Sequence, residues 1–498
     1  MKTLLINSPQ TFFPGAAAIE ASVPIGLLYI AAALENARLE VHIIDAMVTT
    51  YALRKEGEKL QIGLPWNRLQ DEIRRQSPDI VGINNPFTTQ IDNAIRVAEI
   101  TKEVNPKTLT VIGGPHVSVR PVETLEEVKS IDIVVIGEGE YTIVEIVKCM
   151  LRGTSFADIK GIAYRKNGEI IKTLPREPIL DLDKLPFPAY HLVDMEKYLT
   201  PKNIKYRMCR FKRELPMITS RGCPFNCNFC SVQQHMSRRW RAHSKEYIHN
   251  HIRQVIDKYQ VQHLHFEDDN IALETKRFND IINGLLASDR KVTWDTPNGI
   301  RADCLTPDLL DKIKQSGCVE LTIAVESSDQ YILDTVIGKQ LRLDDVINTA
   351  RLCKQKKLKL SAFYVIGFPG ERLENMKKTT GFALMMKRKY GVNFSLFIAT
   401  PLYGTRLYEQ CLSKGYLTHP LTPRALAQAT QAWGKGLIKT ENFTPNQVSQ
   451  IAARTLRARN LLMIIDGFKH PIWALRMAVT FRREVVNFLK FIIRFKQR

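Results

Sequence analysis

Short apolar segments alternate with helical segments along the first 150 residues, and each apolar segment ends in a small or polar residue. A strand that is buried on both faces gives such a continuous apolar run, whereas a half-exposed strand alternates apolar and polar residues. The expected strands are Lys2–Asn7, Leu39–Asp45, Asp79–Asn84, Thr108–Ile112 and Ile131–Ile136, and the clearest helices are Gly26–Asn36 and Ile91–Val104. The sequence therefore predicts an α/β fold that begins with a doubly wound parallel sheet.

The loops after these strands carry a set of glycine and polar residues. In doubly wound sheets, ligands bind beyond the carboxyl ends of the strands, and glycine allows the backbone to approach a bulky ligand closely. The residues at this predicted rim are Asn84, Asn85, Gly113, Gly114, His116, Gly137 and Gly139. The glycines could equally form only the tight turns between strands and helices, so the residues alone leave both interpretations open.

Strand and helix signals resume after residue 209. The expected strands are Met217–Ser220, His263–Glu267, Thr293–Ile300, Glu320–Glu326, Lys359–Ile366 and Asn393–Ala399. Six parallel strands with helices between them favour a partial (β/α)6 barrel over a closed barrel of eight strands. Chemistry in barrels collects at the C-terminal strand ends. Polar residues follow these strands at Glu267–Asn270, Asn298, Arg301, Glu326–Ser328, Gly367–Glu371 and Thr400.

Three cysteines, Cys223, Cys227 and Cys230, lie on the loop after the first of these strands. The C-x3-C-x2-C spacing places three thiolates close enough to hold one face of a cubane iron–sulfur cluster, and the motif offers no fourth cysteine. A cluster that only carries electrons normally has four protein ligands, so the spacing predicts an iron that binds something else. A tetrahedral zinc site completed by His235 or Cys209 is the alternative on spacing alone, although the barrel context favours the cluster.

With these motifs the sequence resembles the radical S-adenosylmethionine (SAM) superfamily, and in particular its cobalamin-binding, methyltransferase-like branch. That branch includes the fosfomycin-pathway methylase and the anaerobic magnesium-protoporphyrin ester cyclase. The cysteine motif carries most of the resemblance, with Phe229 before its last cysteine, and the segments Phe187–His191, Met195–Tyr198 and Phe266–Asn270 add to it. The likeness extends over almost the whole chain. It implies that the cysteines hold a [4Fe-4S] cluster whose fourth iron is chelated by the amino and carboxylate groups of SAM.

The resemblance also implies which residues bind SAM. Glu267, Asp268 and Asp269 correspond to the acidic motif that binds the SAM amino group, and a carboxylate beside an ammonium is favourable in any barrel mouth. The other implied contacts are Phe229 before the last cysteine, Glu326 and Ser327 on the ribose side, Gly367 after the fifth strand, and Ile398 and Ala399 near the adenine. For Glu267, a local salt bridge or a helix cap is the alternative.

By the same resemblance, the first block is a cobalamin-binding domain. Its implied contacts are Asn84, Gly113, Gly114, His116, Gly137 and Gly139. The block departs from cobalamin modules that carry the pattern D-x-H-x-x-G, because Asp45 is followed by Ala46-Met47-Val48 and not by a histidine at the required position. No histidine is therefore expected to bind cobalt there. His116 is either a neighbour of the cobalt or a loop histidine that bonds to the backbone.

The resemblance implies a cobalamin-dependent radical SAM methyltransferase. The expected reaction is hydrogen abstraction from an unactivated carbon by a 5′-deoxyadenosyl radical, followed by methyl transfer from methylcobalamin, with a second SAM restoring the methyl group. The same cofactors could serve a radical cyclisation or oxidation without methyl transfer, as in the ester cyclase. A non-enzymatic cobalamin or metal-binding sensor is the alternative of another class. The sequence assigns no catalytic acid or base, and no substrate beyond a small or lipid-like molecule.

Composition limits the domain organisation and the compartment. At 498 residues, with 44% hydrophobic and 24% charged residues, the chain is expected to fold into several globular domains. They are residues 1–154 for cobalamin, a linker with a small hairpin at 155–208, the radical SAM barrel at 209–436, and a helical basic region at 437–498. No stretch reaches the roughly 18 uninterrupted apolar residues of a membrane span. Nine mostly scattered cysteines fit a reducing compartment, so a cytoplasmic location is expected.

Much of the net charge of +20 lies at the C-terminus, where residues 451–498 hold eleven Lys or Arg and only two acidic residues. Between Ile472 and Phe495, apolar residues at mixed helical spacing are interleaved with basic ones. A basic amphipathic helix can bind a membrane surface, here the inner face of the membrane, whereas a helix packed on the barrel is the alternative. No nucleic acid is expected, because no binding module is recognisable. An electron donor such as flavodoxin or ferredoxin is the expected protein partner.

Overall fold

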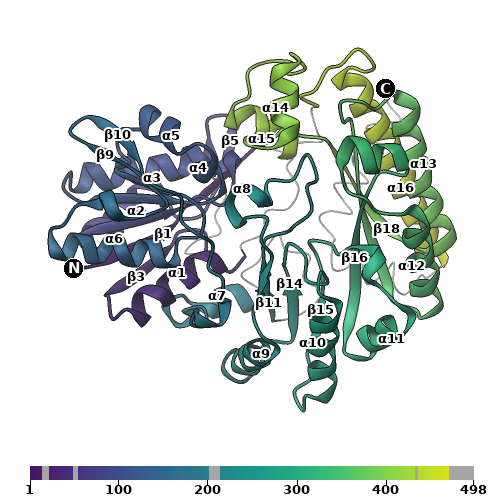
Figure 1. Cartoon of the computed structure of the whole chain (residues 1–498), viewed down its shortest axis with the longest axis horizontal. Coiled ribbons are helices and arrows are strands. Elements are labelled where there is room, and N and C mark those ends of the chain that lie inside the picture. Colours follow the sequence, from purple (N-terminus) through teal and green to yellow (C-terminus); the bar gives the residue numbers. More distant parts are fainter. Residues whose placement is uncertain (14–21, 49–53, 201–212, 432–435, 470–498) are drawn as a thin grey trace.

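A computed structural model describes residues 1–13, 22–48, 54–200, 213–431 and 436–469. The chain forms two α/β units that lie side by side, an N-terminal sheet and a larger open barrel (Figure 1). The predicted combination of a doubly wound sheet and a partial barrel is confirmed. Within the described residues, no helix combines the length and the apolar character that crossing a membrane requires.

The N-terminal sheet contains five parallel strands in the order β8-β7-β6-β1-β3. They are β1 (Thr3–Asn7), β3 (Val41–Asp45), β6 (Ile80–Asn84), β7 (Leu109–Gly113) and β8 (Ile133–Val135), all close to the predicted ranges. The strand order reverses between β1 and β6, and a ligand crevice forms at such a reversal, beyond the carboxyl ends. Asn7, Asn84 and Gly113 end three adjacent strands there and lie in register.

Helices cover both faces of this sheet. α1 (Ile25–Asn36) and α6 (Glu140–Arg152) pack on one face, and α2 (Trp66–Gln76) and α3 (Ile91–Val104) pack on the other. In β1, the residues Leu4, Leu5 and Ile6 are each at most 1% exposed. Burial on both faces explains why these strands read as continuous apolar runs.

An antiparallel hairpin extends the same sheet beyond residue 154. β9 (Ile162–Lys166) pairs with β8, and β10 (Glu169–Lys172) pairs with β9. Asn167 and Gly168 form the turn with φ values of 51° and 86°, as an Asn-Gly pair between two apolar runs predicts. Within the predicted linker, the hairpin thus adds to the first sheet. Most apolar residues from Ile179 to Leu199, including those of α7 (Met195–Leu199), join the barrel core instead, whereas Ala189 packs in the core of the first sheet.

The second unit is an open barrel of six parallel strands in chain order, β11-β14-β15-β16-β17-β18. The strands are β11 (Glu214–Met217), β14 (His263–Phe266), β15 (Thr293–Asp295), β16 (Cys318–Glu326), β17 (Lys359–Ile366) and β18 (Asn393–Ile398). The helices on the outside are α9 (Lys245–Tyr259), α10 (Thr275–Ala287), α11 (Pro307–Gln315), α12 (Leu343–Gln355) and α13 (Leu373–Tyr390) (Figure 1). Among the described strands β11 and β18 are edges, so the barrel does not close.

Two barrel strands end more than one residue before their predicted ends. The first ends at Met217, and the next residues instead form the short ribbon β12 (Ser220–Arg221) with β13 (Arg241–Ala242). β15 ends at Asp295, because Pro297 has no N–H with which to continue the ladder. Both early ends leave loop backbone at the barrel mouth, where the cysteines follow the first strand.

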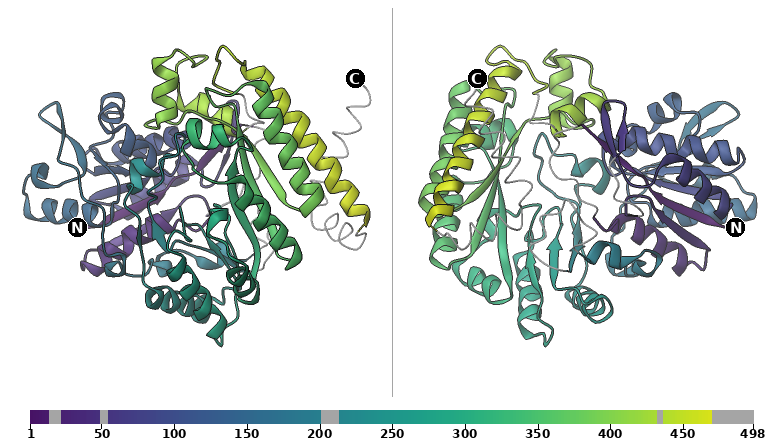
Figure 2. Two further views of the ribbon diagram at one scale, coloured as in Figure 1. Left: turned by 45° about the vertical axis from the view of Figure 1, so that its right-hand side comes forward. Right: turned by 180° about the vertical axis from the view of Figure 1, so that it is seen from behind.

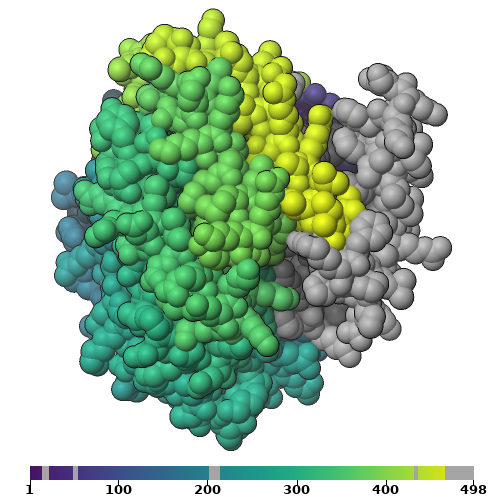
Figure 3. Space-filling model, turned by 90° about the vertical axis from the view of Figure 1, so that its right-hand side faces the viewer, coloured from purple at the N-terminus to yellow at the C-terminus, as the bar shows by residue number. Residues whose placement is uncertain are grey.

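Smaller elements complete the chain. β2 (Gln10–Phe12), β4 (Arg54–Glu56) and β5 (Lys59–Ile62) form an antiparallel sheet that the sequence did not predict. The last helices are α14 (Arg406–Ser413), α15 (Pro423–Gln431) and α16 (Pro445–Lys469). α16 lies along α13 on the outside of the barrel (Figures 2 and 3). The predicted basic amphipathic helix between Ile472 and Phe495 lies outside the described residues.

Candidate functional site

The three cysteines lie on one loop, between β12 and α8 (Val232–Met236). Their partly buried side chains line a cavity of about 560 Å³ at the C-terminal ends of the barrel strands, which we call the cysteine cavity. Burial raises the pKa of all three thiols, that of Cys230 to about 12. A bound metal offsets this effect, because coordination deprotonates a thiol. Three thiols on one cavity wall are a donor set that fits a cluster with one open iron.

Backbone contacts hold the cysteine loop in place. Gly222 has a φ of 80°, and its N–H donates to Asp269 Oδ2 at 3.1 Å. A Cβ at Gly222 would lie 2.7 Å from the Arg239 carbonyl oxygen, so only glycine fits there. Farther along, the Asn228 side-chain amide donates to the Val336 carbonyl at 2.8 Å. The loop is thereby fixed to two distant parts of the barrel.

Five of the nine residues predicted to contact SAM border the cysteine cavity. They are Phe229, Asp269, Glu326, Ile398 and Ala399. The Phe363 and Phe397 rings, from β17 and β18, also border it and lie 5.7 Å apart. The wall therefore combines apolar surface with carboxylates, the two kinds of contact that a molecule with a nucleoside and an amino-acid end requires. The residues fit SAM on these grounds.

Two cations that the sequence did not assign to SAM complete this wall. Lys339 Nζ lies 2.8 Å from Glu326 Oε1, and both side chains are 7% exposed. The Arg301 guanidinium lies 4.1 Å from the centre of the Phe225 ring and donates to the Lys339 carbonyl at 2.9 Å. Separating Glu326 from Lys339 would leave a buried charge without a partner, which is strongly destabilising. The two side chains therefore stay paired.

The acidic run after β14 divides between two cavities. Asp269 borders the cysteine cavity and also a cavity at the rim of the first sheet, which we call the rim cavity, while Glu267 borders only the rim cavity. Asp268 is 2% exposed and accepts hydrogen bonds from Thr219 N at 3.0 Å and from Ser220 Oγ at 2.6 Å. Neighbouring residues of an extended segment point in opposite directions. Asp268 therefore supports the backbone that leads to the cysteines.

Ser327 and Gly367 lie behind the wall of the cysteine cavity. Ser327 is fully buried, with its Oγ 3.2 Å from Thr379 Oγ1. Gly367 has a φ of 95° and donates its N–H to Glu371 Oε2 at 2.6 Å. The contacts of Ser327 and Gly367 with SAM stay predictions, and the structure gives both residues a part in shaping the strand ends next to Glu326.

The rim cavity has a volume of about 650 Å³ and lies between the first sheet and the cysteine loop. Five of the six residues predicted to contact cobalamin border it, namely Asn84, Gly113, Gly114, Gly137 and Gly139. An added Cβ would meet no protein atom closer than 3.8 Å at Gly113 and 3.7 Å at Gly137, so space remains beyond the backbone. At Gly114 it would lie 2.0 Å from the Asn85 carbonyl oxygen, so Gly114 is needed for backbone packing. The open positions give the cradle that a bulky cofactor such as cobalamin requires.

His116 lies apart from the rim cavity, on α4 (Pro115–Val119). Its Nδ1 lies 3.2 Å from Thr88 Oγ1, and its ring packs edge-on against Tyr403 at 5.8 Å. Burial lowers the pKa of His116 to about 4, so the ring is neutral near pH 7. The expected hydrogen bond of His116 to the backbone is instead a hydrogen bond to the Thr88 side chain. The position of His116 still fits a buried loop histidine better than a neighbour of the cobalt.

His235, on α8, is the histidine that borders the rim cavity. Its Nδ1 lies 3.0 Å from the Ser231 carbonyl oxygen. His235 does not border the cysteine cavity, which disfavours the zinc site that it would complete. Cys209, the other candidate fourth ligand, lies outside the described residues.

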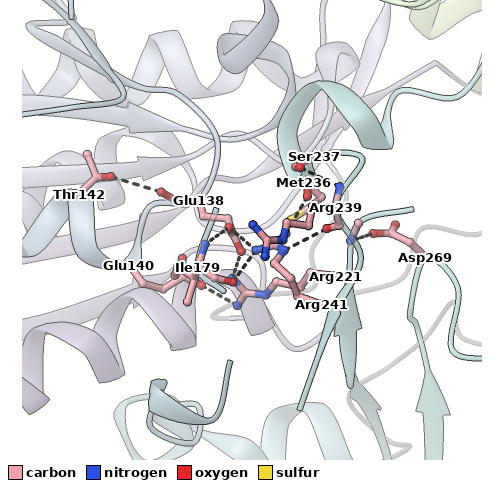
Figure 4. A network of polar contacts seen from close by, with 11 residues as sticks. Glu138, Glu140, Thr142, Ile179, Arg221, Met236, Ser237, Arg239, Arg241 and Asp269 are labelled. Atoms are coloured by element: carbon pink, nitrogen blue, oxygen red, sulfur yellow. Dashed lines mark hydrogen bonds and ion pairs between the residues drawn. The ribbon is translucent and has the colours of Figure 1, made fainter. Parts of the chain in front are cut away.

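An ion-pair network joins the two units beside the rim cavity (Figure 4). Arg221 donates to Glu138 Oε1 at 2.8 Å and to Glu140 Oε1 at 2.6 Å, and Arg241 donates to Glu138 Oε2 at 2.6 Å. These side chains are 2 to 7% exposed. Although burial opposes it, the two carboxylates hold the pKa of Arg221 above its usual value. Sequence reasoning missed this network, and its only signal was the position of Arg221 just before the cysteines.

Family models match both units of the chain. The model of the B12 binding domain matches residues 19–147, which include most of the parallel sheet. The model of the Radical SAM superfamily matches residues 217–383, which include the cysteine loop and the strands β14 to β17.

Curated proteins of related sequence include two methyltransferases and a cyclase. The chain is 29% identical over 488 residues to an uncharacterized methyltransferase of Pyrococcus horikoshii, which covers 96% of this chain and 97% of that protein. It is 28% identical over 447 residues to the cytidylyl-2-hydroxyethylphosphonate methyltransferase of Streptomyces wedmorensis, covering 84% and 82%. It is 28% identical over 318 residues to the anaerobic magnesium-protoporphyrin IX monomethyl ester cyclase of Rubrivivax gelatinosus, covering 63% and 55%.

Solved structures share the fold of both units. The radical S-adenosylmethionine methyltransferase TsrM from Kitasatospora setae, solved with cobalamin and a [4Fe-4S] cluster bound, gives a TM-score of 0.63 at 17% identity, covering 84% of this chain and 76% of that one. The cobalamin-dependent S-adenosylmethionine radical enzyme OxsB, solved with aqua-cobalamin and S-adenosylmethionine bound, gives 0.61 at 18% identity, covering 92% and 61%.

Proposed function

We propose that this chain, a cobalamin-binding radical SAM enzyme whose cofactors are cobalamin, a [4Fe-4S] cluster and SAM, transfers a methyl group from methylcobalamin to an unactivated carbon of its substrate. The observation that carries the proposal is that the cysteine cavity and the rim cavity share Asp269 in their walls. A substrate carbon held at that wall can face both cofactors without leaving one site. Such positioning is worth a large part of a reaction barrier.

When bound, these groups supply a 5′-deoxyadenosyl radical, formed from one SAM with one electron, and a methyl group, which a second SAM replaces with the uptake of a second electron. The chain binds, orients and shields them. Cys223, Cys227 and Cys230 would hold the cluster, while Glu326 and Asp269 offer carboxylates to the hydroxyl and ammonium groups of SAM. The aromatic rings on the cavity wall exclude water, which protects a reactive radical from side reactions.

A radical cyclisation or oxidation with the same cofactors is the second candidate. The likeness to the ester cyclase of Rubrivivax gelatinosus, which covers 63% of this chain, favours it. The likeness to two proteins named as methyltransferases covers more of the chain, 96% and 84%, and favours methyl transfer. A cobalamin or metal-binding sensor is the third candidate, and it predicts no turnover of SAM.

One experiment separates these three functions. The protein is purified without oxygen, loaded with iron, sulfide and cobalamin, and incubated with reductant, SAM and candidate substrates. Methyl transfer predicts 5′-deoxyadenosine, S-adenosylhomocysteine and a methylated product in comparable amounts. Consumption of substrate with 5′-deoxyadenosine but no S-adenosylhomocysteine would identify the non-methylating reaction instead. The absence of both nucleosides would reject every enzymatic function.

We also propose that a separate protein, such as flavodoxin or ferredoxin, reduces the cluster, and that the substrate is a small or lipid-like molecule. Outside the cysteine loop, the described cysteines are Cys149, Cys304, Cys318, Cys353 and Cys411. They are scattered over both units and form no second cluster motif. The electrons that the reaction consumes would be supplied by such a donor. To test this proposal, reduced flavodoxin is added to the cluster-loaded protein, and the reduction of the cluster is monitored by the visible absorption of the cluster.

We further propose that the enzyme is cytoplasmic and contacts the inner face of the membrane. The last described turns of α16 expose the apolar side chains of Leu461, Met463, Ile464 and Ile465. Eleven basic residues lie between 451 and 498, and basic charge beside apolar side chains favours anionic lipid surfaces. Sedimentation with vesicles should show binding to anionic lipid that salt weakens. Equal binding to neutral and anionic vesicles would contradict the proposal.

A further inference from the structure

The first cysteine follows two residues that are held in place on either side, Arg221 by the first unit and Gly222 by the barrel. Arg221 pairs with Glu138 and Glu140, Gly222 donates its N–H to Asp269, and Cys223 is the first thiol. In Figure 4 the two glutamates, which follow β8 in the first unit, point at the guanidinium groups of Arg221 and Arg241, which belong to the barrel unit. The first cluster ligand is thus two residues away from a side chain that is anchored on the first sheet.

The Arg221 guanidinium is fixed in orientation as well as in position. Its two terminal nitrogens donate to different carboxylates, at 2.8 and 2.6 Å, and its Cζ lies 5.2 Å from the centre of the Tyr29 ring on α1. A planar guanidinium makes such paired bonds, whereas a lysine presents one compact charge. Arg221 can therefore set the angle of the cysteine loop and not only its distance from the sheet.

Arg241 holds the other oxygen of Glu138 and the chain that follows the cysteines. Besides Glu138 Oε2, it donates to the carbonyl oxygens of Met236 at 2.7 Å and Arg239 at 3.1 Å. It also donates to the Ile179 carbonyl at 2.9 Å. Both ends of the cysteine loop are in this way connected to Glu138.

The network specifies geometry more than it adds stability. Two arginines and two glutamates balance in charge, and a buried ion pair can often be replaced by apolar side chains without loss of stability. Removing one partner has a large effect, because it leaves a charge buried without compensation. Tyr29, Glu138, Glu140 and Arg221 all border the rim cavity as well. The network therefore lies between the place of one cofactor and the loop that holds the other.

We propose that Arg221, with Glu138, is a positioning residue that sets the separation and angle between the cluster and the cobalamin. The inference rests on the proposed function only in that the two cofactors act on one carbon. A displacement of about 1 Å can slow such a reaction roughly a hundredfold. Without Arg221, the enzyme should still cleave SAM but transfer few methyl groups, so that the two reactions become uncoupled.

The test measures the separation directly. In protein loaded with the cluster and cobalamin and poised so that the reduced cluster and cob(II)alamin are both paramagnetic, pulsed dipolar EPR gives the distribution of distances between them. The wild-type protein should give one narrow distribution. Arg221→Gln should broaden or shift it by about 1 Å or more, and Arg221→Lys should recover part of the wild-type distribution, because lysine can pair with one carboxylate.

Glu138→Gln is the second variant, and it lies far from the cysteines in sequence. Both Glu138 oxygens accept from nitrogen donors, Oε1 from Arg221 and Oε2 from Arg241 and from Ile179 N at 2.9 Å. Whichever way the new amide is turned, its NH₂ group faces a donor. This variant should load a normal amount of iron and, at saturating cobalamin, broaden the distance distribution. The double variant should add little to either single one, since the residues act as one unit.

Arg213→Gln is the matched control. Arg213 makes two bonds to the exposed Glu196, at 3.0 and 2.6 Å, away from both cavities, so the distances and the methyl transfer should stay as in the wild type. A wild-type distribution in Glu138→Gln would overturn the inference, and so would a broad distribution in the wild type itself. If Arg221→Gln fails to hold the cluster, Glu138→Gln alone decides. A narrow wild-type distribution without any methylated product would reject the proposed function and leave the inference standing.

Discussion

Glu326 and Lys339 form a buried ion pair on the wall of the cysteine cavity, with 2.8 Å between Oε1 and Nζ. Glu326 has a φ of 67° at a bulge in β16. Such a backbone conformation is rare outside glycine, persists only where the surroundings enforce it, and is enriched at functional sites. We expect Glu326→Gln to weaken SAM binding about tenfold or more, because a hydrogen bond to a charged group is worth roughly 1.5 to 3 kcal/mol. Equilibrium dialysis with cluster-loaded protein measures the change.

Ser327→Ala is the matched control for this prediction. Ser327 was also predicted to contact SAM, but its hydroxyl lies behind the wall beside Thr379. Its loss should lower the thermal stability and leave the dissociation constant for SAM within about twofold, since no bond to the ligand is removed. An equal loss of affinity in the two variants would place Ser327 in the ligand contacts and contradict this interpretation.

Cys227→Ala should prevent assembly of a stable cluster and abolish the formation of 5′-deoxyadenosine. Two thiolates cannot replace the three that the motif provides. The iron content and the visible absorption of the loaded protein measure the effect on the cluster. Cys353→Ala, a change in the buried core far from the loop, should keep the iron content of the wild type. Full radical formation in Cys227→Ala would refute the cluster assignment.

Gly113→Ala should weaken cobalamin binding without destabilising the protein. A methyl group there meets no protein atom closer than 3.8 Å and takes up space at the wall of the rim cavity. Spectroscopic titration with cobalamin measures the affinity, and thermal denaturation of the apoprotein measures the stability. Gly381→Ala on α13 is the control, because an added Cβ there also meets nothing within 4 Å but lies far from the cavity. Unchanged affinity in Gly113→Ala would remove Gly113 from the cobalamin site.

Local patterns predicted the main strands and helices of both units, because a strand that is buried is made of apolar residues and can be recognised from its own sequence. The cysteine loop was equally readable, since its three ligands lie within eight residues. The early end of β15 could have been read from Pro297. The small sheet of β2, β4 and β5 could not, because its strands are only three or four residues long and carry no clear alternation.

The arrangement of the candidate site was predicted only in part. A motif consists of consecutive residues, but their side chains point in different directions. Glu267 borders the rim cavity, Asp268 bonds to the backbone before the cysteine loop, and Asp269 borders both cavities. Tertiary pairs leave no local pattern at all. Arg221 meets Glu138 across 83 positions, and each residue alone reads as an ordinary charged residue of a loop.

The buried carboxyl group of Glu371, in the loop after β17, should make the stability of the protein depend on pH. Its Oε2 accepts the N–H groups of Gly367 and Phe368 at 2.6 and 2.8 Å, and burial raises its pKa from 4.5 to about 7. Below about pH 4.5, Glu371 is protonated in both the folded and the unfolded chain. As the pH rises toward 7, the unfolded chain loses the proton first, so the free energy of unfolding falls. The total loss is about 3 kcal/mol, because one pKa unit corresponds to about 1.4 kcal/mol.

Glu371→Gln removes this titration while its oxygen can still accept both N–H groups. The variant's free energy of unfolding, measured by urea denaturation of the apoprotein, should therefore rise relative to that of the wild type between pH 5 and pH 8. The comparison uses the change with pH, so any constant effect of the buried NH₂ group cancels. Glu374→Gln, an exposed change in the first turn of α13, should follow the wild type across this range. A constant difference between Glu371→Gln and the wild type at every pH would show that the Glu371 carboxyl ionises normally, despite its burial.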